Sequence, residues 1–473
     1  MKTQIGGYRP TQSSLPYVVA AFALGVLAVA STVSAMAALA ASIVFMLSYH
    51  HPLRALYVLI LMTPFSGSPF LDHHFFQAPG AKPFILTAFM VIAVMLINQD
   101  QAIKMPRVAV ISSSIVLSLL TISVLRSTNH LTVINSFRPE SLSFSRYILS
   151  DYLKPIIYFL PFIVVTRCAR TETQQEQVLR LVVLALCCLS ACLLYLCVAA
   201  GKGGLNEATV NVLYANHLGA HRNQLATYYI LGFPIVLSYF FRRRNALSVI
   251  AIVLSLLAAT FLYSRTAYFN IPLGVLGYLA ISKRMKLWPI AILLFILFIS
   301  VISVSVKERA LTGTRSGDID ALSAGRTGGI WTPLIDEYLH NPSKLLWGAG
   351  RYGILVSQSK KNGGELEGIE HPHNMYLEQL IDNGILGAAL MIGIHLLIIG
   401  SYIHKLINTM TSFDEYRYGV LLSMLMYFLA GLTGRSLFPV YDNSFLWIIM
   451  AIACLKISQV DLALKASDAR SIG

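Results

Sequence analysis

Apolar residues run in long blocks along most of the chain, and short polar turns separate these blocks. Apolar runs of about 18 or more residues are typical of membrane-spanning helices. Two of the blocks, 53–66 and 154–166, are short enough to be re-entrant or partial spans, so we expect about 12 to 14 helices. The pattern therefore predicts an all-α, polytopic membrane helix bundle. The candidate spans are 15–31, 34–49, 53–66, 84–98, 108–125, 154–166, 178–200, 224–241, 246–263, 267–281, 287–306, 384–404, 418–433 and 443–457.

One long polar segment, 307–372, interrupts the series of apolar blocks. Its middle part, 325–339, carries apolar residues at helical spacing, which predicts an amphipathic helix that packs on the membrane surface or caps the bundle. Asn341-Pro342 is expected to end this helix. We therefore predict transmembrane helices over 1–306, a large outward loop over 307–383 and C-terminal transmembrane helices over 384–473.

Composition supports a membrane protein and excludes several other classes. The 473 residues are 56% hydrophobic and only 12% charged, whereas an average soluble domain is about 25% charged. A soluble enzyme, a disordered chain and a coiled coil are therefore excluded. The net charge of +14 would suit a nucleic-acid partner, but no soluble basic domain is present to carry one. The six cysteines lie within or beside apolar spans, which predicts neither disulfides nor zinc ligands.

The distribution of basic residues predicts the topology. If the N-terminus is inside, most Lys and Arg residues of the short loops fall on that side, as cytoplasmic loops require. The tight turns 242–244 and 283–286 give the clearest signal. Both termini are then cytoplasmic, and segment 307–372 faces outward. The apolar stretch from Leu15 to about Ser48 is too long for the core of a cleavable signal peptide, so none is expected.

Four arginines are predicted at the outward face: Arg222, Arg265, Arg326 and Arg435. Arg265 lies in a short turn between two apolar spans, which would hold its guanidinium at the depth of lipid headgroups. An arginine there either reaches to water from the membrane edge or binds an anion through its bidentate fork. Glycines around Arg326 would let a ligand approach the backbone closely. Together these arginines suit a polyanionic group such as a lipid diphosphate.

His373 is the best-placed proton acceptor on the same face. It lies in the stretch before the next predicted span, at the expected N-terminus of a helix, where the helix dipole favours a neutral imidazole. A neutral imidazole is a competent general base at pH 7, whereas a structural histidine at a helix start is the simpler alternative. His371 lies two residues away, but no third ligand accompanies the pair at a recognisable spacing, so a metal is not expected. Nearby acidic residues that could orient His373 are Glu370, Glu378 and Asp382.

Between about Arg222 and Gly387 the sequence resembles the O-antigen ligase/polymerase superfamily of bacterial envelope proteins. The motif HNxYL…NGxxG, which follows the long outward loop, is the most specific part of this resemblance. The residues that carry it are Ser264-Arg265, Gly325-Arg326…Trp331, Asn341-Pro342…Trp347-Gly348-Ala349-Gly350 and His373-Asn374-Met375-Tyr376-Leu377…Asn383-Gly384-Ile385-Leu386-Gly387.

The resemblance implies a glycosyltransferase of the GT-C-like kind, embedded among the lipids of the bacterial inner membrane with its active site facing the periplasm. It implies an undecaprenyl-diphosphate-linked glycan as donor, and neither a cofactor nor a metal. Arg222 and Arg265 would contact the diphosphate, and Arg326 would assist them. His373 would activate the acceptor hydroxyl for attack with inversion. Further matches to the substrate site are His371, Asn374 and Tyr376.

Several functions remain open on this basis. A ligase would move finished polysaccharide to lipid A-core, and we favour this function. A polymerase would transfer the chain to a second lipid-linked repeat unit, and a third possibility is transfer to protein. A transporter of lipid-linked oligosaccharide is the alternative from another class, but the predicted spans are almost free of the midplane charges that transporters use.

Overall fold

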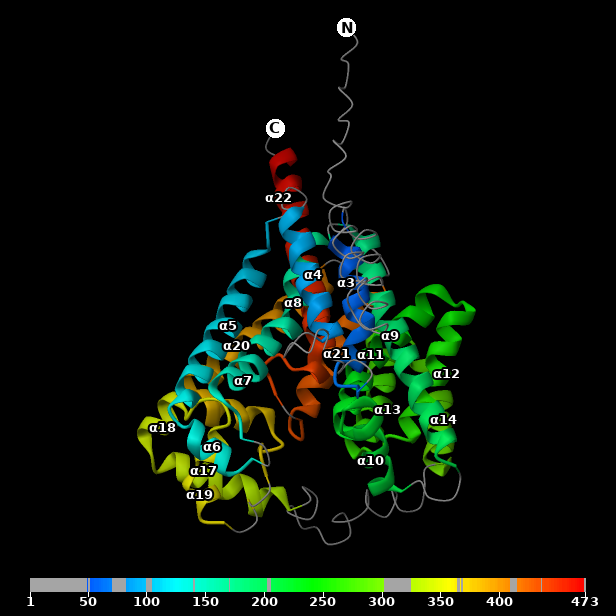
Figure 1. The fold of residues 1–473 in the computed structure, drawn as a ribbon. Coiled ribbons are helices and arrows are strands. Elements are labelled where there is room, and N and C mark those ends of the chain that lie inside the picture. The colour runs from blue at the N-terminus through cyan, green and yellow to red at the C-terminus, as the bar shows by residue number, and fades with distance from the viewer. Residues whose placement is uncertain are drawn as a thin grey trace, which may run out of the picture.

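The computed structural model describes residues 49, 52–69, 82–98, 104–138, 141–169, 171–201, 206–301, 325–363, 366, 369–408, 415–434 and 436–471. Within these ranges all regular structure is helical (Figure 1). Six helical segments are long and apolar enough to cross a membrane, and several shorter apolar helices accompany them. The prediction of an all-α, polytopic membrane bundle is therefore confirmed.

Each predicted span from 53–66 onward coincides with a helix. The predicted spans 15–31 and 34–49 lie outside the described residues, apart from Tyr49. The helices of the bundle are α3 (Pro52–Met62), α4 (Pro83–Ile97), α5 (Arg107–Thr128), α8 (Lys154–Cys168), α9 (Glu172–Ala199), α11 (Arg222–Arg243), α12 (Ala246–Thr260), α13 (Arg265–Ile281), α14 (Trp288–Val301), α20 (Met375–Asn408), α21 (Glu415–Ala430) and α22 (Ser444–Ser471).

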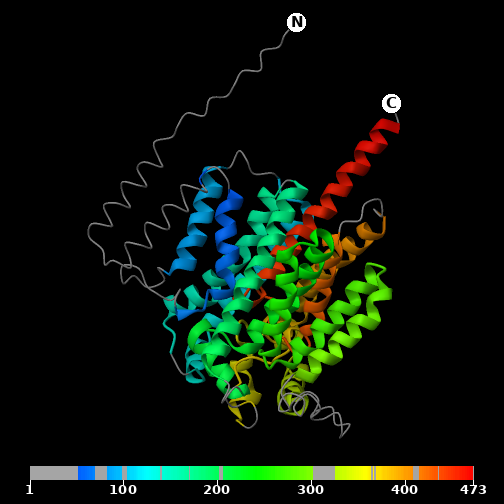
Figure 2. The same cartoon turned by 90° about the vertical axis from the view of Figure 1, so that its right-hand side faces the viewer.

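Helices α11 and α22 form the centre of the bundle. Helix α11 packs against α9, α12, α13 and α21, and α22 packs against α8, α20 and α21. Trp447 of α22 is fully buried, with its ring 4.9 Å from the ring of Phe159 in an edge-on contact. Figure 2 shows α22 passing through the bundle and projecting beyond the neighbouring helices at its C-terminal end. Apolar packing on several sides explains the apolar runs 228–237 of α11 and 445–455 of α22.

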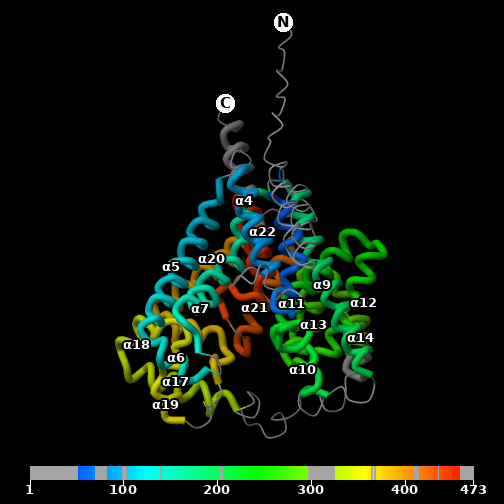
Figure 3. The backbone as a smooth tube through the Cα atoms, in the orientation of Figure 1, coloured from blue at the N-terminus to red at the C-terminus, as the bar shows by residue number. Residues whose placement is uncertain are grey.

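The two ends of the bundle differ in their polar contacts. One end, which we call the ion-pair end, joins neighbouring helices through the pairs Arg243–Glu176 at 2.9 Å, Lys456–Glu172 at 2.6 Å and Arg284–Glu415 at 2.8 Å. The other end, the loop end, carries short helices that the apolar pattern does not predict (Figure 3). These are α6 (Leu131–Ser136), α7 (Phe144–Ile148), α10 (Glu207–Leu218), α18 (Pro342–Trp347) and α19 (Gln358–Lys361). The ion pairs and the short helices thus lie at opposite ends of the bundle, in agreement with loops that alternate between two sides. Which end faces which side of the membrane stays a prediction.

The predicted amphipathic helix of the long loop is present as the π-helix η7 (Thr327–Trp331) continued by α17 (Thr332–Leu339). Its apolar stripe caps the bundle. Leu334 and Tyr338 are fully buried in a small cluster with Ile134 of α6 and Ile381 of α20, whereas Leu339 on the other face is 61% exposed. The hydroxyl of Tyr338 also donates a hydrogen bond to the carbonyl of Ile381 at 3.1 Å. The long loop is therefore a folded cap over the N-terminal part of α20.

Candidate functional site

His373 lies two residues before Met375, the first residue of α20. Asn374 caps this helix, because its side-chain oxygen accepts hydrogen bonds from the amides of Tyr376 at 3.0 Å and Leu377 at 3.1 Å. The backbone of His373 has a φ of 53°, in the left-handed region that side chains other than glycine rarely adopt. The predicted location of His373 at a helix start is correct. Asn374 and Tyr376 have structural roles in the bundle, and the substrate contacts predicted for them stay predictions.

The rings of His371 and His373 lie against each other, edge to face, with their centroids 3.9 Å apart. Pro372 between them accepts a hydrogen bond on its carbonyl from the indole nitrogen of Trp331 at 2.8 Å. The cap helix that begins after Arg326 is thereby fixed beside both histidines. Sequence motifs that are far apart in the chain therefore converge at one place.

The loop after α21 joins the His373 region to the Arg265 region. The amide of Met375 donates to the carbonyl of Gly431 at 3.0 Å, and the hydroxyl of Tyr376 donates to the carbonyl of Phe428 at 2.6 Å. Three residues after Ala430, the hydroxyl of Thr433 lies 3.3 Å from the hydroxyl of Thr266. Because Thr266 follows Arg265, the starts of α20 and α13 flank the same short loop. Arg435, the fourth predicted arginine, lies outside the described residues.

Arg222 and Arg265 are neighbours, but their surroundings differ. Arg222 is buried at the start of α11, where it forms an ion pair with Glu207 of α10 and donates to the carbonyl of Tyr263 at 2.6 Å. Arg265 is partly buried, and its guanidinium makes no hydrogen bond or ion pair within the part of the chain that the structure describes. Two neighbouring cations repel each other, so an anion beside Arg265 would be favoured. The prediction that Arg222 contacts an anion stays a prediction, and the structure adds that Arg222 holds the turn before Arg265.

A second buried charge cluster lies one turn further along α20, and the sequence analysis missed it. Arg351 is buried and forms ion pairs with Glu378 at 2.9 Å and Asp382 at 3.4 Å. Burial disfavours charge on Arg351, but the two carboxylates outweigh burial and raise the pKa of the guanidinium. Glu378 and Asp382 are four residues apart, so both carboxylates lie on the same face of the helix. This spacing could have suggested from the sequence that they share a cationic partner. Both carboxylates are thus engaged with Arg351.

Tyr352 extends this cluster toward α7. Its hydroxyl donates a hydrogen bond to Asp151, and the guanidinium of Arg138 lies over its ring at 4.1 Å. Burial, followed by the negative charge of Asp151, raises the pKa of Tyr352, so the phenol stays neutral. Asp151 and Arg138 both come from segments outside the matching motifs. The cluster therefore ties the cap to the bundle through several chain segments.

Glycines in the long loop and in α20 allow the backbones of these two segments to lie in close contact. Gly348 and Gly384 have φ values of 75° and 67°, which favour glycine. A Cβ atom on Gly348 would lie 2.4 Å from the carbonyl oxygen of Asp382, and one on Gly384 would lie 2.3 Å from that of Leu346. The bond from the amide of Gly350 to the carbonyl of Asp382, at 2.9 Å, completes the contact. These glycines let α18 press against the kink in α20.

A metal ion held by the part of the chain that the structure describes would need several ligating side chains at one place. No group of three or more His, Cys, Asp or Glu side chains gathers there in a way that could hold an ion. His371 and His373 form a pair, and among the described residues they belong to no group of three such side chains. The requirement for a metal therefore stays a question for experiment.

Part of the chain matches a known protein family. Residues 250–392 match the family model described as O-antigen ligase. The matched part runs from α12 to the first half of α20, and it contains Arg265, Arg326 and His373. A comparison with curated proteins finds no match. This match supports the resemblance to the O-antigen ligase/polymerase superfamily and, broadly, a function of the O-antigen ligase type.

Proposed function

We propose that the chain is an inverting glycosyltransferase of the bacterial inner membrane, with its active site at the periplasmic face. It would transfer a glycan from undecaprenyl diphosphate to the hydroxyl of an acceptor lipid. The observation that carries this proposal is the position of His373 and Arg265 on either side of one short loop, 431–434, at the loop end of the bundle. This pairs a proton acceptor with a cation that makes no hydrogen bond or ion pair among the residues that the structure describes.

Arg265 would bind the diphosphate of the donor. A guanidinium forms bidentate, charge-assisted hydrogen bonds to phosphate oxygens, and partial burial strengthens them. Arg222 would support this contact, because its bond to the carbonyl of Tyr263 fixes the turn that leads to Arg265. Arg326, at the start of the cap helix, would add a further positive charge near the histidines.

His373 would act as the general base. The oxygen of the acceptor hydroxyl would attack the anomeric carbon of the glycan while the imidazole takes its proton. A new carbon–oxygen bond forms, the bond from that carbon to the diphosphate breaks, and the electron pair leaves with the diphosphate. One displacement of this kind inverts the anomeric configuration.

The leaving group explains why a second carboxylate is not required. Arginines beside the diphosphate would stabilise the charge that develops on it, so the step needs no general acid. A glycoside hydrolase instead uses two carboxyl groups. Glu378 and Asp382 lie near His373 in sequence, but both form ion pairs with Arg351 and are therefore not assigned to orient the base.

We propose lipid A-core as the acceptor, which would make the chain an O-antigen ligase. Purified protein in detergent would be given undecaprenyl-diphosphate glycan with either lipid A-core or a second lipid-linked repeat. Glycan transfer to lipid A-core supports the ligase. Transfer only to the second lipid-linked repeat would identify a polymerase instead, and no transfer to either lipid would contradict the glycosyltransferase and favour a transporter.

A further inference from the structure

Exposed apolar side chains gather on the cap where it meets the edge of the bundle. Helix α18 presents Leu346 and Trp347, which are 40% and 50% exposed, and Leu339 at the end of α17 is exposed as well. We call these three residues the cap patch. Figure 1 shows α18 at the lateral edge of the molecule, beside the loop-end parts of α5 and α20. Large apolar groups that are exposed together mark a contact with lipid or with another protein.

The cap patch continues the apolar surface of two membrane helices. Leu125 of α5 and Ile385 of α20 are exposed apolar residues of segments that are long and apolar enough to cross a membrane. Helix α18 meets both helices at these positions. An added Cβ on Gly384 would lie 2.5 Å from the amide nitrogen of Trp347, and the guanidinium of Arg126 lies 5.8 Å from the centre of the Trp347 ring. The apolar surface of the spans therefore runs on to the cap.

The limits of two predicted spans meet at the same place. The apolar pattern ends one span at residue 125 and begins another at residue 384. Arg126, directly after the first limit, and Gly384, at the second, both lie against Trp347. Tryptophan is enriched at the level of lipid headgroups, and an arginine at the end of a span reaches from there to water. Two separate helices thus place α18 at the boundary between hydrocarbon and headgroups.

The polar residues of α17 show where the water side of the cap begins. Asp336 and His340 lie 3.4 Å apart across one turn of this helix, and both side chains are highly exposed. Charged and polar groups at such positions stay in water, because their transfer into hydrocarbon is costly. The contact with hydrocarbon is therefore expected at α18 and not along all of α17.

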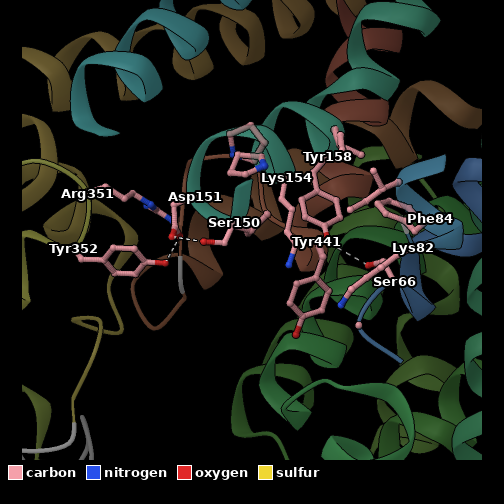
Figure 4. Close-up of a pocket in the computed structure, with 16 residues that line it drawn as sticks. Ser66, Lys82, Phe84, Ser150, Asp151, Lys154, Tyr158, Arg351, Tyr352 and Tyr441 are labelled. Atoms are coloured by element: carbon pink, nitrogen blue, oxygen red, sulfur yellow. Dashed lines mark hydrogen bonds between the residues drawn. The ribbon is translucent and has the colours of Figure 1, made fainter. Parts of the chain in front are cut away.

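The segment after α18 fixes the cap patch in this position. The amide of Arg351 donates a hydrogen bond to the carbonyl of Ser123 in α5 at 2.9 Å, and the hydroxyl of Ser127 donates to the carbonyl of Arg351 at 2.6 Å. The next residue, Tyr352, donates its hydroxyl to Asp151 in the wall of a cavity of about 360 Å³ (Figure 4). The cap would have to break buried hydrogen bonds to leave the edge of the bundle.

We propose that α18 is an interfacial helix, with Leu346 and Trp347 inserted into the lipid bilayer at the level of the headgroups. Its partner is the surrounding membrane lipid, which is neither donor nor acceptor of a glycan, so the proposal goes beyond the proposed function and does not depend on it. The contact anchors the cap to the membrane. It thereby also holds Trp331, whose indole binds the carbonyl of Pro372 between the two histidines.

Tryptophan fluorescence in lipid nanodiscs tests this contact. The chain has four tryptophans, so the emission of Trp347 is the difference between wild type and Trp347→Phe. The full-length protein would be placed in nanodiscs of phosphatidylcholine, with or without bromine atoms near the top of the acyl chains, and iodide would serve as the quencher in water. We expect the brominated lipid to remove most of this difference emission and iodide to remove little of it.

Two further variants, both made in Trp347→Phe, provide a second reporter and a matched control. Leu346→Trp moves the indole to the other exposed residue of α18, and brominated lipid should quench it in the same way. Asp336→Trp places the indole on the polar face of α17, where iodide should quench it and brominated lipid should not. Both positions are exposed, so the melting temperatures of these variants should match that of Trp347→Phe.

The pattern of quenching distinguishes the occupants of the cap patch. Quenching of Trp347 by iodide but not by brominated lipid would place α18 in water and overturn the proposal. Protection from both quenchers would show that a second copy of the chain or another protein covers α18, which would also overturn it. If His373→Ala kept full activity, the proposed chemistry would fail, whereas the quenching of Trp347 by lipid would be unaffected.

Discussion

Met375 and Gly431 are joined by a backbone hydrogen bond of 3.0 Å, which holds the start of α20 against the loop that also contacts α13. His373 lies two residues before Met375, and Arg265 lies one residue before the Thr266 contact to the same loop. The bond therefore sets the position of the proposed base relative to the proposed phosphate-binding residue. A site built by such a contact depends on the packing of α20 and α21 as much as on the two functional side chains.

The assignment of the loop end to the periplasm can be tested with reporter fusions. We expect reporters at Lys361, in the cap, and near Arg243, at the ion-pair end, to show opposite compartments, with Lys361 periplasmic and Arg243 cytoplasmic. The two positions lie at opposite ends of the bundle. The same compartment for both would contradict the topology and, with it, the location of the proposed site.

Arg265 should be required for donor binding. Arg265→Ala removes the bidentate phosphate contact, so we expect the Kd for the lipid-linked donor to rise about 10- to 100-fold. Arg265→Lys keeps the charge but not the fork, and should lose most of the activity although the protein still inserts in the membrane. Arg146→Ala, at an exposed position in α7, is the control and should bind donor as wild type does. If Arg265→Ala bound the donor with wild-type affinity, the side chain of Arg265 would only extend to water from the membrane edge and would not hold the donor.

The Arg351 cluster should contribute strongly to stability. Arg351→Met leaves Glu378 and Asp382 buried without their cation, so we expect a loss of about 3–5 kcal/mol in the free energy of unfolding. Lys344→Met breaks a partly exposed pair with Glu337 and should cost only about 0–1 kcal/mol. Thermal melting in detergent would rank the two variants. Adding Glu378→Gln and Asp382→Asn to Arg351→Met should recover part of the loss, and equal melting temperatures of Arg351→Met and wild type would rule out a buried, charged cluster.

Gly384 should tolerate no larger residue. Gly384→Ala places a Cβ 2.3 Å from the carbonyl oxygen of Leu346 and forces alanine into a left-handed φ, so we expect a loss of more than about 1–2 kcal/mol. Gly393→Ala is the control in the same helix, since no atom lies within 4 Å of its added Cβ. Its melting temperature should stay the same or rise. A melting temperature for Gly384→Ala that matched this control would show that the backbone contact between α18 and α20 is not a tight one.

Much of the bundle follows from the sequence, because a membrane span needs a long apolar run and such runs are visible without an alignment. The buried stripe of the cap could be predicted for a similar reason, since Leu334 and Tyr338 recur at helical spacing. The short helix α10 mixes polar and apolar residues without a clear apolar stripe, so periodicity does not reveal it. Its Glu207 nevertheless pairs with Arg222 and changes the interpretation of that arginine.

The candidate site was predictable only where its residues are close in sequence. His373 at a helix start could be read from Pro372, His373 and the apolar run that follows. The pairing of Arg351 with Glu378 and the bond from Trp331 to Pro372 depend on contacts between distant segments. No local pattern encodes such contacts, so they became visible only with the packed helices.

The pair of histidines offers a check on the role of metal. We expect chelators to leave transfer by the wild-type protein unchanged, because the proposed step uses only arginines and one imidazole. His371→Ala should reduce the rate less than His373→Ala, although the contact between the two rings makes some loss expected. Inhibition by a chelator that a divalent ion reverses would instead support a metal held by the two histidines.

The most direct test of the central claim is the rate of glycan transfer by His373→Ala, measured at saturating donor and acceptor alongside the Kd for the donor. Loss of a general base typically lowers the rate about 10²- to 10⁴-fold, and in the proposed mechanism Arg265 rather than His373 holds the donor. His340→Ala, at a position whose side chain is 79% exposed in the same loop, serves as the control. We predict that His373→Ala loses turnover by that factor, binds donor as tightly as wild type does and leaves the control unaffected. Equal turnover by His373→Ala and wild type would contradict the assignment of His373 as the catalytic base.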